Sequence, residues 1–99
     1  MKTILLPLIL LLAACASPAP QFFGALRHDL TVGGIGFTVF EKDDRVEVIR
    51  HGYLPRAARD RVPGLMRQAV EQATGCRLRG DLVTKLPGDT GEARGRIDC

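Results

Sequence analysis

Residues 36–50 read GFTVFEKDDRVEVIR, and this stretch decides the fold. Residues 36–41 and 45–50 are rich in β-branched and aromatic side chains, and a short polar segment with two aspartates separates them. Such a pattern predicts a β-hairpin with the aspartates in its turn. Pairing Glu41 with Val46 gives this hairpin one apolar face. The residues on that face are Phe37, Val39, Val46 and Val48.

A further strand is expected before this hairpin, within residues 21–32. Apolar side chains recur there at even spacing, as in a strand with one buried face. They are Phe22, Leu26, Leu30 and Val32. Gly33 and Gly34 then turn the chain into the hairpin. Phe40 and Ile49 fall on the opposite face of the hairpin, where either the preceding linker or a partner would have to cover them.

The pattern changes to a helical one after residue 54. Between residues 58 and 73, apolar residues recur at spacings of three and four, which predicts an amphipathic helix. They are Ala58, Val62, Leu65, Met66, Ala69, Val70 and Ala73. Proline is favoured in a first helical turn and glycine just after a last one, so the helix is expected from Pro63 to Thr74, with Gly75 ending it. A looser turn is expected over residues 55–61.

Residues 76–99 predict a second hairpin around a turn at residues 86–89, which has Pro-Gly at its centre. This register aligns Cys76 with Cys99 and leaves one discordant pair of like charges, Arg79 opposite Arg96. The other opposed pairs are Arg77 and Asp98, Leu78 and Ile97, Asp81 and Arg94, and Leu82 and Ala93. The expected fold is therefore α+β, in which two β-hairpins form a small antiparallel sheet and one α-helix packs on one face. The expected element order is β-β-(β)-α-β-β.

The amino terminus has the layout of a secretory signal. Lys2 precedes an apolar run that ends at Ala14, which is roughly 16 Å long as a helix and too short for a bilayer core of about 30 Å. The sequence Leu12-Ala13-Ala14-Cys15 resembles the lipobox of bacterial lipoproteins, in which an aliphatic residue and two small residues precede a cysteine. The alternative is an ordinary signal peptide followed by a chance cysteine.

The resemblance implies that residues 1–14 are removed and that Cys15 carries a diacylglycerol and an amide-linked acyl chain such as palmitate. Several acyl chains anchor a protein stably. Residues 15–20 then form a short proline-containing tether, and residues 21–99 form one small domain. We identify no family motif in residues 21–99. Ala16, in place of an aspartate, favours the outer membrane if the cell has one.

The two other cysteines, Cys76 and Cys99, are expected to form a disulfide. An exported domain lies in an oxidising compartment, and the predicted register already places these residues opposite each other. Such a bond stabilises a small domain by about 3 kcal/mol in the chain-entropy model. Zinc binding and redox activity are the alternatives, but the chain has no C-x-x-C spacing.

The residues for nucleophilic catalysis are scarce, which favours a protein that is not an enzyme. Ser17 is the only serine in the sequence, and it lies in the tether. His28 is expected to be a half-buried structural histidine, and His51 to lie at a strand edge. A small enzyme or metal-binding protein that uses these two histidines remains the alternative. The glycines of residues 33–36 are better explained by a turn than by a phosphate-binding loop.

Positive charge is concentrated between residues 50 and 79. Seven arginines and two acidic residues give this region a net charge of +5, and the rest of the mature chain is negative. The candidates for binding an anionic partner are Arg56, Arg59, Arg61 and Arg67. An anionic lipid surface or an acidic envelope protein would suit them, but a biased composition and a solvated helix face are the simpler explanation. Nucleic acid is not expected, because the chain is exported and lacks a platform of aromatic residues.

These observations predict a small lipid-anchored protein of the cell envelope that serves as a binding or structural module and has no cofactor besides the lipid on Cys15. In a cell with two membranes, the periplasmic side of the outer membrane is favoured. An adaptor that docks on an envelope complex or an anionic lipid surface through the basic helix region is the closest alternative.

Overall fold

A computed structural model describes residues 20–86 and 88–99 of the chain. The predicted signal peptide, the lipid attachment at Cys15 and most of the tether lie outside these residues. The elements in chain order are η2 (Pro20–Phe22), β1 (Leu26–Val32), β2 (Ile35–Lys42), β3 (Arg45–Arg50), η3 (Arg56–Arg61), α2 (Val62–Thr74), β4 (Arg77–Val83) and β5 (Glu92–Asp98).

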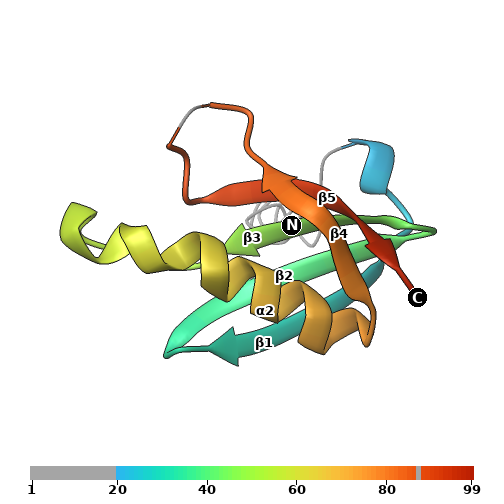
Figure 1. The fold of residues 1–99 in the computed structure, drawn as a ribbon, viewed down its shortest axis with the longest axis horizontal. Helices are drawn as coiled ribbons and strands as arrows, with labels where there is room; N and C mark the ends of the chain where they lie inside the picture. Colours follow the sequence, from blue (N-terminus) through green and yellow to red (C-terminus); the bar gives the residue numbers. More distant parts are fainter. Residues whose placement is uncertain (1–19, 87) are drawn as a thin grey trace, which may run out of the picture.

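The five strands form one antiparallel sheet in the order β1-β2-β3-β5-β4, and α2 lies across one face of it (Figure 1). This arrangement confirms the predicted α+β fold with one helix on an antiparallel sheet. The sheet order adds a feature that the sequence analysis did not predict, because β5 lies between β3 and β4. The second hairpin thus joins the first through its last strand, and β4 forms an edge of the sheet.

The first hairpin has the predicted register. Glu41 pairs with Val46, and Asp43 takes up a left-handed φ of 56° in the turn between the strands. The predicted apolar face points towards α2 and forms the core. Its members Phe37, Val39, Val46 and Val48 are each at most 1% exposed.

Helix α2 supplies the other half of the core. Val62, Met66, Ala69 and Val70 are buried at spacings of four, three and one, so they form one apolar stripe. The helix starts one residue before the expected Pro63, and η3 takes the place of the expected looser turn. Gly75 ends it with a φ of 72°, and its N–H donates to the Glu71 carbonyl at 3.0 Å.

The prediction of one strand over residues 21–32 was wrong at its start. Strand β1 begins only at Leu26, which is 65% exposed, and Phe22 lies in η2 instead. Gly24 adopts a left-handed φ of 82°, which turns the chain between the two elements. Phe22 is 2% exposed although it is not part of the core beneath α2.

Phe22 and its element η2 cover part of the sheet face opposite to α2. Element η2 contacts β2, and Phe40 of that strand is only 5% exposed. The Arg27 guanidinium also lies 5.9 Å from the centre of the Phe40 ring. Element η2 therefore covers the part of this face around Phe40, whereas Ile49 is half-buried. The linker that the sequence offered as a cover lies outside the described residues except for Pro20, so that alternative stays a prediction.

The second hairpin keeps the predicted register only near its open end. Arg77, Leu78 and Arg79 pair as expected, but Val83, rather than Asp81, lies opposite Arg94. The predicted pairing of Leu82 with Ala93 is therefore wrong as well. Strand β4 is irregular between Arg79 and Val83, and Gly80 within this irregularity has a left-handed φ of 69°.

Gly95 of β5 makes room for this irregularity. A Cβ atom there would lie 2.9 Å from Leu82 Cδ2 and 3.1 Å from Leu78 Cδ1. Both leucines therefore pack over the glycine on the side of α2. The packing of Leu78 and Leu82 over Gly95 therefore accompanies the loss of regular backbone pairing between Arg79 and Val83.

A disulfide joins Cys76 to Cys99, whose Cα atoms lie 4.5 Å apart. Cys76 follows Gly75, the residue that ends α2, and its N–H donates to Thr74 Oγ1 at 3.1 Å. The bond therefore ties the end of the helix to the last residue of the chain, next to the paired strands β4 and β5.

Candidate functional site on the open face of the sheet

The sheet face opposite to α2, which we call the open face, carries a line of positive charges across four strands. Lys42 of β2 pairs with Arg45 of β3, Arg45 pairs with Arg96 of β5, and Arg96 pairs with Arg79 of β4. We call these four residues the basic row. Directly opposed residues in a sheet have Cβ atoms about 5 Å apart, and like charges at that separation are destabilising.

Neighbouring acidic residues neutralise only part of the basic row. Arg96 donates to Asp44 at 3.0 Å, and Arg79 is paired with Asp98. Lys42 donates to the Phe23 carbonyl at 3.0 Å, which uses a hydrogen bond but leaves its charge unbalanced. The Arg45 side chain is exposed and forms no hydrogen bond or ion pair with any residue of the described ranges.

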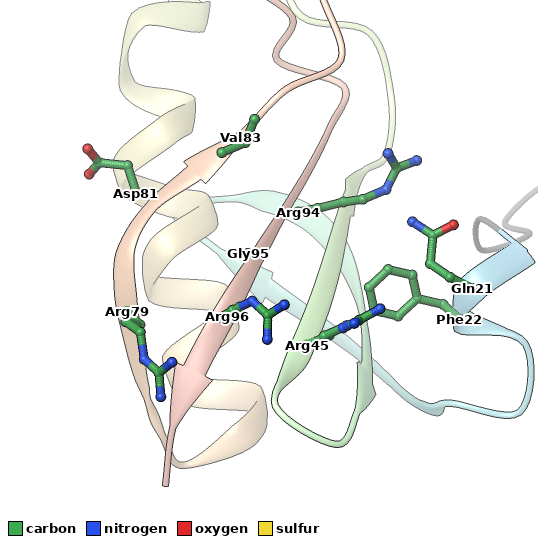
Figure 2. A pocket seen from close by; sticks show the side chains of 9 residues that line it. All are labelled: Gln21, Phe22, Arg45, Arg79, Asp81, Val83, Arg94, Gly95 and Arg96. Atoms are coloured by element: carbon green, nitrogen blue, oxygen red, sulfur yellow. The ribbon is translucent and has the colours of Figure 1, made fainter.

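A hollow of about 540 Å³ lies along this row (Figure 2). Arg45, Arg79, Arg94 and Arg96 line it, and Gln21 and Phe22 of η2 form one wall. Its other lining residues are Asp81, Val83 and Gly95. The lining thus combines four arginines with one aspartate and two apolar side chains, and three of the arginines are already paired with carboxylates.

Arg94 is held over the sheet by the buried residue Glu47. The Arg94 Nε donates to Glu47 Oε2 at 2.8 Å, and the Glu47 side chain is 1% exposed whereas that of Arg94 is 38% exposed. A buried carboxylate needs such a partner. Since one guanidinium has five N–H donors, Arg94 retains donors that can reach the hollow.

The chemistry of this hollow is that of an anion site. Guanidinium groups bind phosphate and carboxylate oxygens with paired, charge-assisted hydrogen bonds. Among residues 20–86 and 88–99, no group of three or more histidine, cysteine, aspartate or glutamate side chains is placed to hold a metal ion.

A second polar group lies further along the open face. Thr38 Oγ1 lies 2.6 Å from Asp29 Oδ1 and 2.6 Å from His51 Nε2, and Thr38 is completely buried. Asp29 and His51 also border a smaller hollow of about 300 Å³. The hydrogen bond from Thr38, followed by that from Arg27, lowers the pKa of the Asp29 carboxyl below its usual value of 3.8.

The direction of these hydrogen bonds follows from the charge on Asp29. An ionised carboxylate can only accept, so Thr38 donates its single hydroxyl proton to Asp29 and accepts a hydrogen bond from His51 Nε2. In this arrangement His51 holds its proton towards Thr38 and is not placed to remove one from it. The group therefore orders the end of β3 against β1 and β2.

The two histidines lie on opposite sides of the sheet. His28 pairs with Val39 of the core face, and its Nε2 lies 3.1 Å from Glu41 Oε1. His51 contacts Thr38 of the open face. The structure therefore does not bring together the two residues on which the enzyme or metal-binding alternative depends.

Three of the four arginines that the sequence analysis singled out hold backbone segments. Arg59 Nε donates to the Leu54 carbonyl at 2.9 Å, Arg61 to that of Gly33 at 2.6 Å, and Arg67 to that of Gly80 at 2.6 Å. Arg67 also lies 3.5 Å from Asp81, and the Arg59 guanidinium lies 6.0 Å from the centre of the Tyr53 ring. Arg56 is exposed and has no such contact among the described residues. Their binding of an anionic partner stays a prediction.

Arg45, Arg94 and Arg96 were not predicted as binding residues, because they lie outside the region of residues 50–79 in which positive charge is concentrated along the chain. The single available signal was the discordant pair of Arg79 and Arg96. That pair is present in the structure, and the position of β5 beside β3 extends it to Arg45.

Comparison of the chain with known protein families, curated proteins and solved structures gave no match in any of the three. Within the described residues, no helix combines the length and the apolar character needed to cross a bilayer.

Proposed function

We propose that this protein is a small lipid-anchored component of the bacterial cell envelope, with a folded domain that is a non-catalytic binding or structural module. The observation that carries the proposal is the sequence Leu12-Ala13-Ala14-Cys15 directly after an apolar run of signal-peptide length. In a cell with two membranes, the proposed location is the periplasmic side of the outer membrane.

Two features of the folded domain support an exported protein with a binding role. The Cys76–Cys99 disulfide is of the kind that persists in oxidising compartments. The arginines around the hollow offer donors for an anion. The hydroxyl of Thr38 is buried and already donates to Asp29, so it supports no nucleophilic role.

An adaptor that uses the region around η3 and α2 is the second candidate. The net charge of +5 between residues 50 and 79 favours it, and the acidic surface of an envelope protein would be its partner. Arg56→Glu and Arg59→Glu would then weaken co-purification with that partner. Unchanged co-purification would exclude the adaptor.

The lipid anchor is tested by expressing the full chain in a bacterium supplied with labelled palmitate. We expect the label on the protein, a mature mass that begins at Cys15 and recovery in the membrane fraction. Cys15→Ala should abolish the label and leave the leader uncut. The matched control is the double variant Cys76→Ala/Cys99→Ala, which also loses thiol groups but should keep the label. An unlabelled wild-type chain with an uncut leader in the cytosol would contradict the proposal.

A further inference from the structure

We propose that the basic row docks the domain, open face down, on the anionic phospholipid headgroups of the same membrane that holds the lipid anchor. The occupant of the hollow is then a phospholipid phosphate. This inference rests on the proposed lipid anchor. Beyond the anchor, it specifies which surface of the domain faces the bilayer and which lipid group that surface binds.

The distance along the chain from Cys15 to the hollow is the first argument. Five residue steps separate Cys15 from Pro20, and a fully extended chain covers at most about 18 Å in that distance. The next two residues, Gln21 and Phe22, already line the hollow. An anchored chain therefore holds the hollow close to the headgroups, whatever path the tether takes.

The distribution of charge is the second argument. The basic row has four cations and two carboxylate partners, Asp44 and Asp98. Arg45 lies in the middle of the row without a partner among the described residues. A phosphate beside Arg45 would supply the counter-charge that Arg45 lacks, and it would reduce the repulsion between Arg45 and the directly opposed Arg96.

Exposed apolar side chains on both sides of the cations are the third argument. Phe23 follows the wall of the hollow and is 61% exposed, and Val83 lines the hollow on β4 and is 69% exposed. Surfaces that lie on a bilayer combine such apolar groups with arginine or lysine. The basic side chains bind the lipid phosphates, and the apolar side chains reach below the phosphates.

The tether also explains why a partly neutralised site is sufficient. A linked site meets its ligand at an effective concentration in the millimolar range, so docking needs only weak affinity. A docked open face would turn α2 and η3 away from the bilayer, because they lie on the other face of the sheet (Figure 1). Arg56 would then face the solvent and be free to meet a partner.

A tryptophan reporter can measure this orientation, because the chain contains no tryptophan. Val83→Trp places the reporter at the hollow, and Tyr53→Trp, at a residue that is 84% exposed, places a control near η3. Each full-length, lipid-carrying protein is reconstituted into phosphatidylcholine vesicles with and without phosphatidylglycerol. A quencher attached to the headgroups then reports contact. We expect phosphatidylglycerol to increase the quenching at position 83 and to leave position 53 unchanged.

Two charge reversals at exposed arginines without partners provide the matched test. Arg45→Glu should lower the ratio of docked to undocked protein roughly thirty-fold, since the surface loses one positive charge and gains a negative one. It should not lower the melting temperature, because the new carboxylate lies opposite Arg96 and Lys42. Arg56→Glu should leave the quenching unchanged. Excess inorganic phosphate should compete with docking only weakly, because it is not held by a tether.

The inference is overturned if the quenching at position 83 is independent of phosphatidylglycerol or is not reduced by Arg45→Glu. It is also overturned if Arg56→Glu reduces the quenching as strongly, because docking would then use the region of η3. Full competition by inorganic phosphate would assign the hollow to a soluble anion instead. Failure of the anchor itself is recognised separately, because the purified protein would then lack the mass of the lipid.

Discussion

The two faces of the sheet are stabilised by different physical effects. On the face beneath α2, the side chains of Phe37, Val39 and Val48 are aliphatic or aromatic and almost fully buried. On the open face, buried Thr38 and Glu47 are held by hydrogen bonds and an ion pair. Apolar burial has no preferred direction and tolerates small shifts, whereas buried polar groups are stable only with each partner in place.

This contrast also separates stability from binding. The core face offers little to a partner because α2 covers it, and α2 contacts four of the five strands. Within the part of the chain that the structure describes, η2 lies over one side of the open face, and the arginines beside the hollow are accessible. The open face is therefore where substitutions should change binding with the least effect on folding.

The largest effect is expected from truncating the two phenylalanines of β2 that lie on opposite faces. Phe37→Ala should lower the free energy of unfolding by about 3–5 kcal/mol, because it opens a cavity in the core. Phe40→Ala should cost about 2 kcal/mol, since among the described residues η2 and Arg27 cover Phe40 from the surface of the domain, where the site can collapse or admit water.

Urea denaturation of both variants measures the difference. Phe23→Ala is the control, because that side chain is 61% exposed and its removal should change the free energy of unfolding by at most about 0.5 kcal/mol. If Phe37→Ala and Phe40→Ala lowered the free energy of unfolding equally, the open face would contribute a second apolar core. The two faces would then not differ in how they are stabilised.

A smaller difference is expected between two acidic residues of the open face. Glu47→Gln should lower the free energy of unfolding by about 1–3 kcal/mol, because Glu47 is buried and its charge is matched to Arg94. Asp44→Asn should cost less than about 1 kcal/mol, because both partners in its pair with Arg96 are half-exposed.

Denaturation at low and high salt distinguishes these two pairs. Salt should weaken the contribution of Asp44 and change that of Glu47 little, since screening acts mainly on exposed charges. If Asp44→Asn were the more destabilising of the two, the half-exposed pair of Asp44 with Arg96 would contribute more to stability than the buried pair of Glu47 with Arg94.

The smallest effect is expected in acid. The pKa of Asp29 is lowered by Thr38 and Arg27, and the pKa of Asp98 is lowered by Arg79. A lowered pKa in the folded state contributes stability that is fully present above the usual value of 3.8 and is lost as the pH falls through the folded value. The melting temperature should therefore decrease in the range below that usual value.

Carbon NMR titration of the aspartate carboxyl groups tests the cause. Thr38→Val keeps the shape of the side chain, and it should raise the pKa of Asp29 towards its usual value. Asp98 serves as the internal control and should keep its lowered pKa in this variant. An unchanged pKa of Asp29 would show that Arg27 alone is responsible.

The regular parts of the fold were predictable from local patterns. The hairpin around Asp43, the helix that ends at Gly75 and the pairing of Leu78 with Ile97 follow from side-chain period and turn chemistry. Each of these signals lies within a few residues of the feature that it specifies. The start of β1 was mispredicted because Phe22 has the spacing of a strand residue, while Gly24 turns the chain.

The irregular pairing of β4 with β5 could not be predicted from local sequence patterns. Leu78 and Leu82 are four residues apart, and a regular strand would place them on one face in either register. The glycine opposite them, Gly95, lets both approach β5 closely, and this packing shifts Val83 to a position opposite Arg94. Such a contact between two strands is visible only once they are assembled.

The sequence by itself determined the alternation of buried and exposed residues, the turns and the cysteine positions, because these depend on backbone geometry and on neighbours along the chain. Only the tertiary structure decided that β5 lies beside β3, and with it that Arg45, Arg96 and Arg79 form one line. The physical reason is that a row across a sheet is a property of strand order and register. Residues that are distant in the chain and carry no shared motif become neighbours only through the packing of the whole domain.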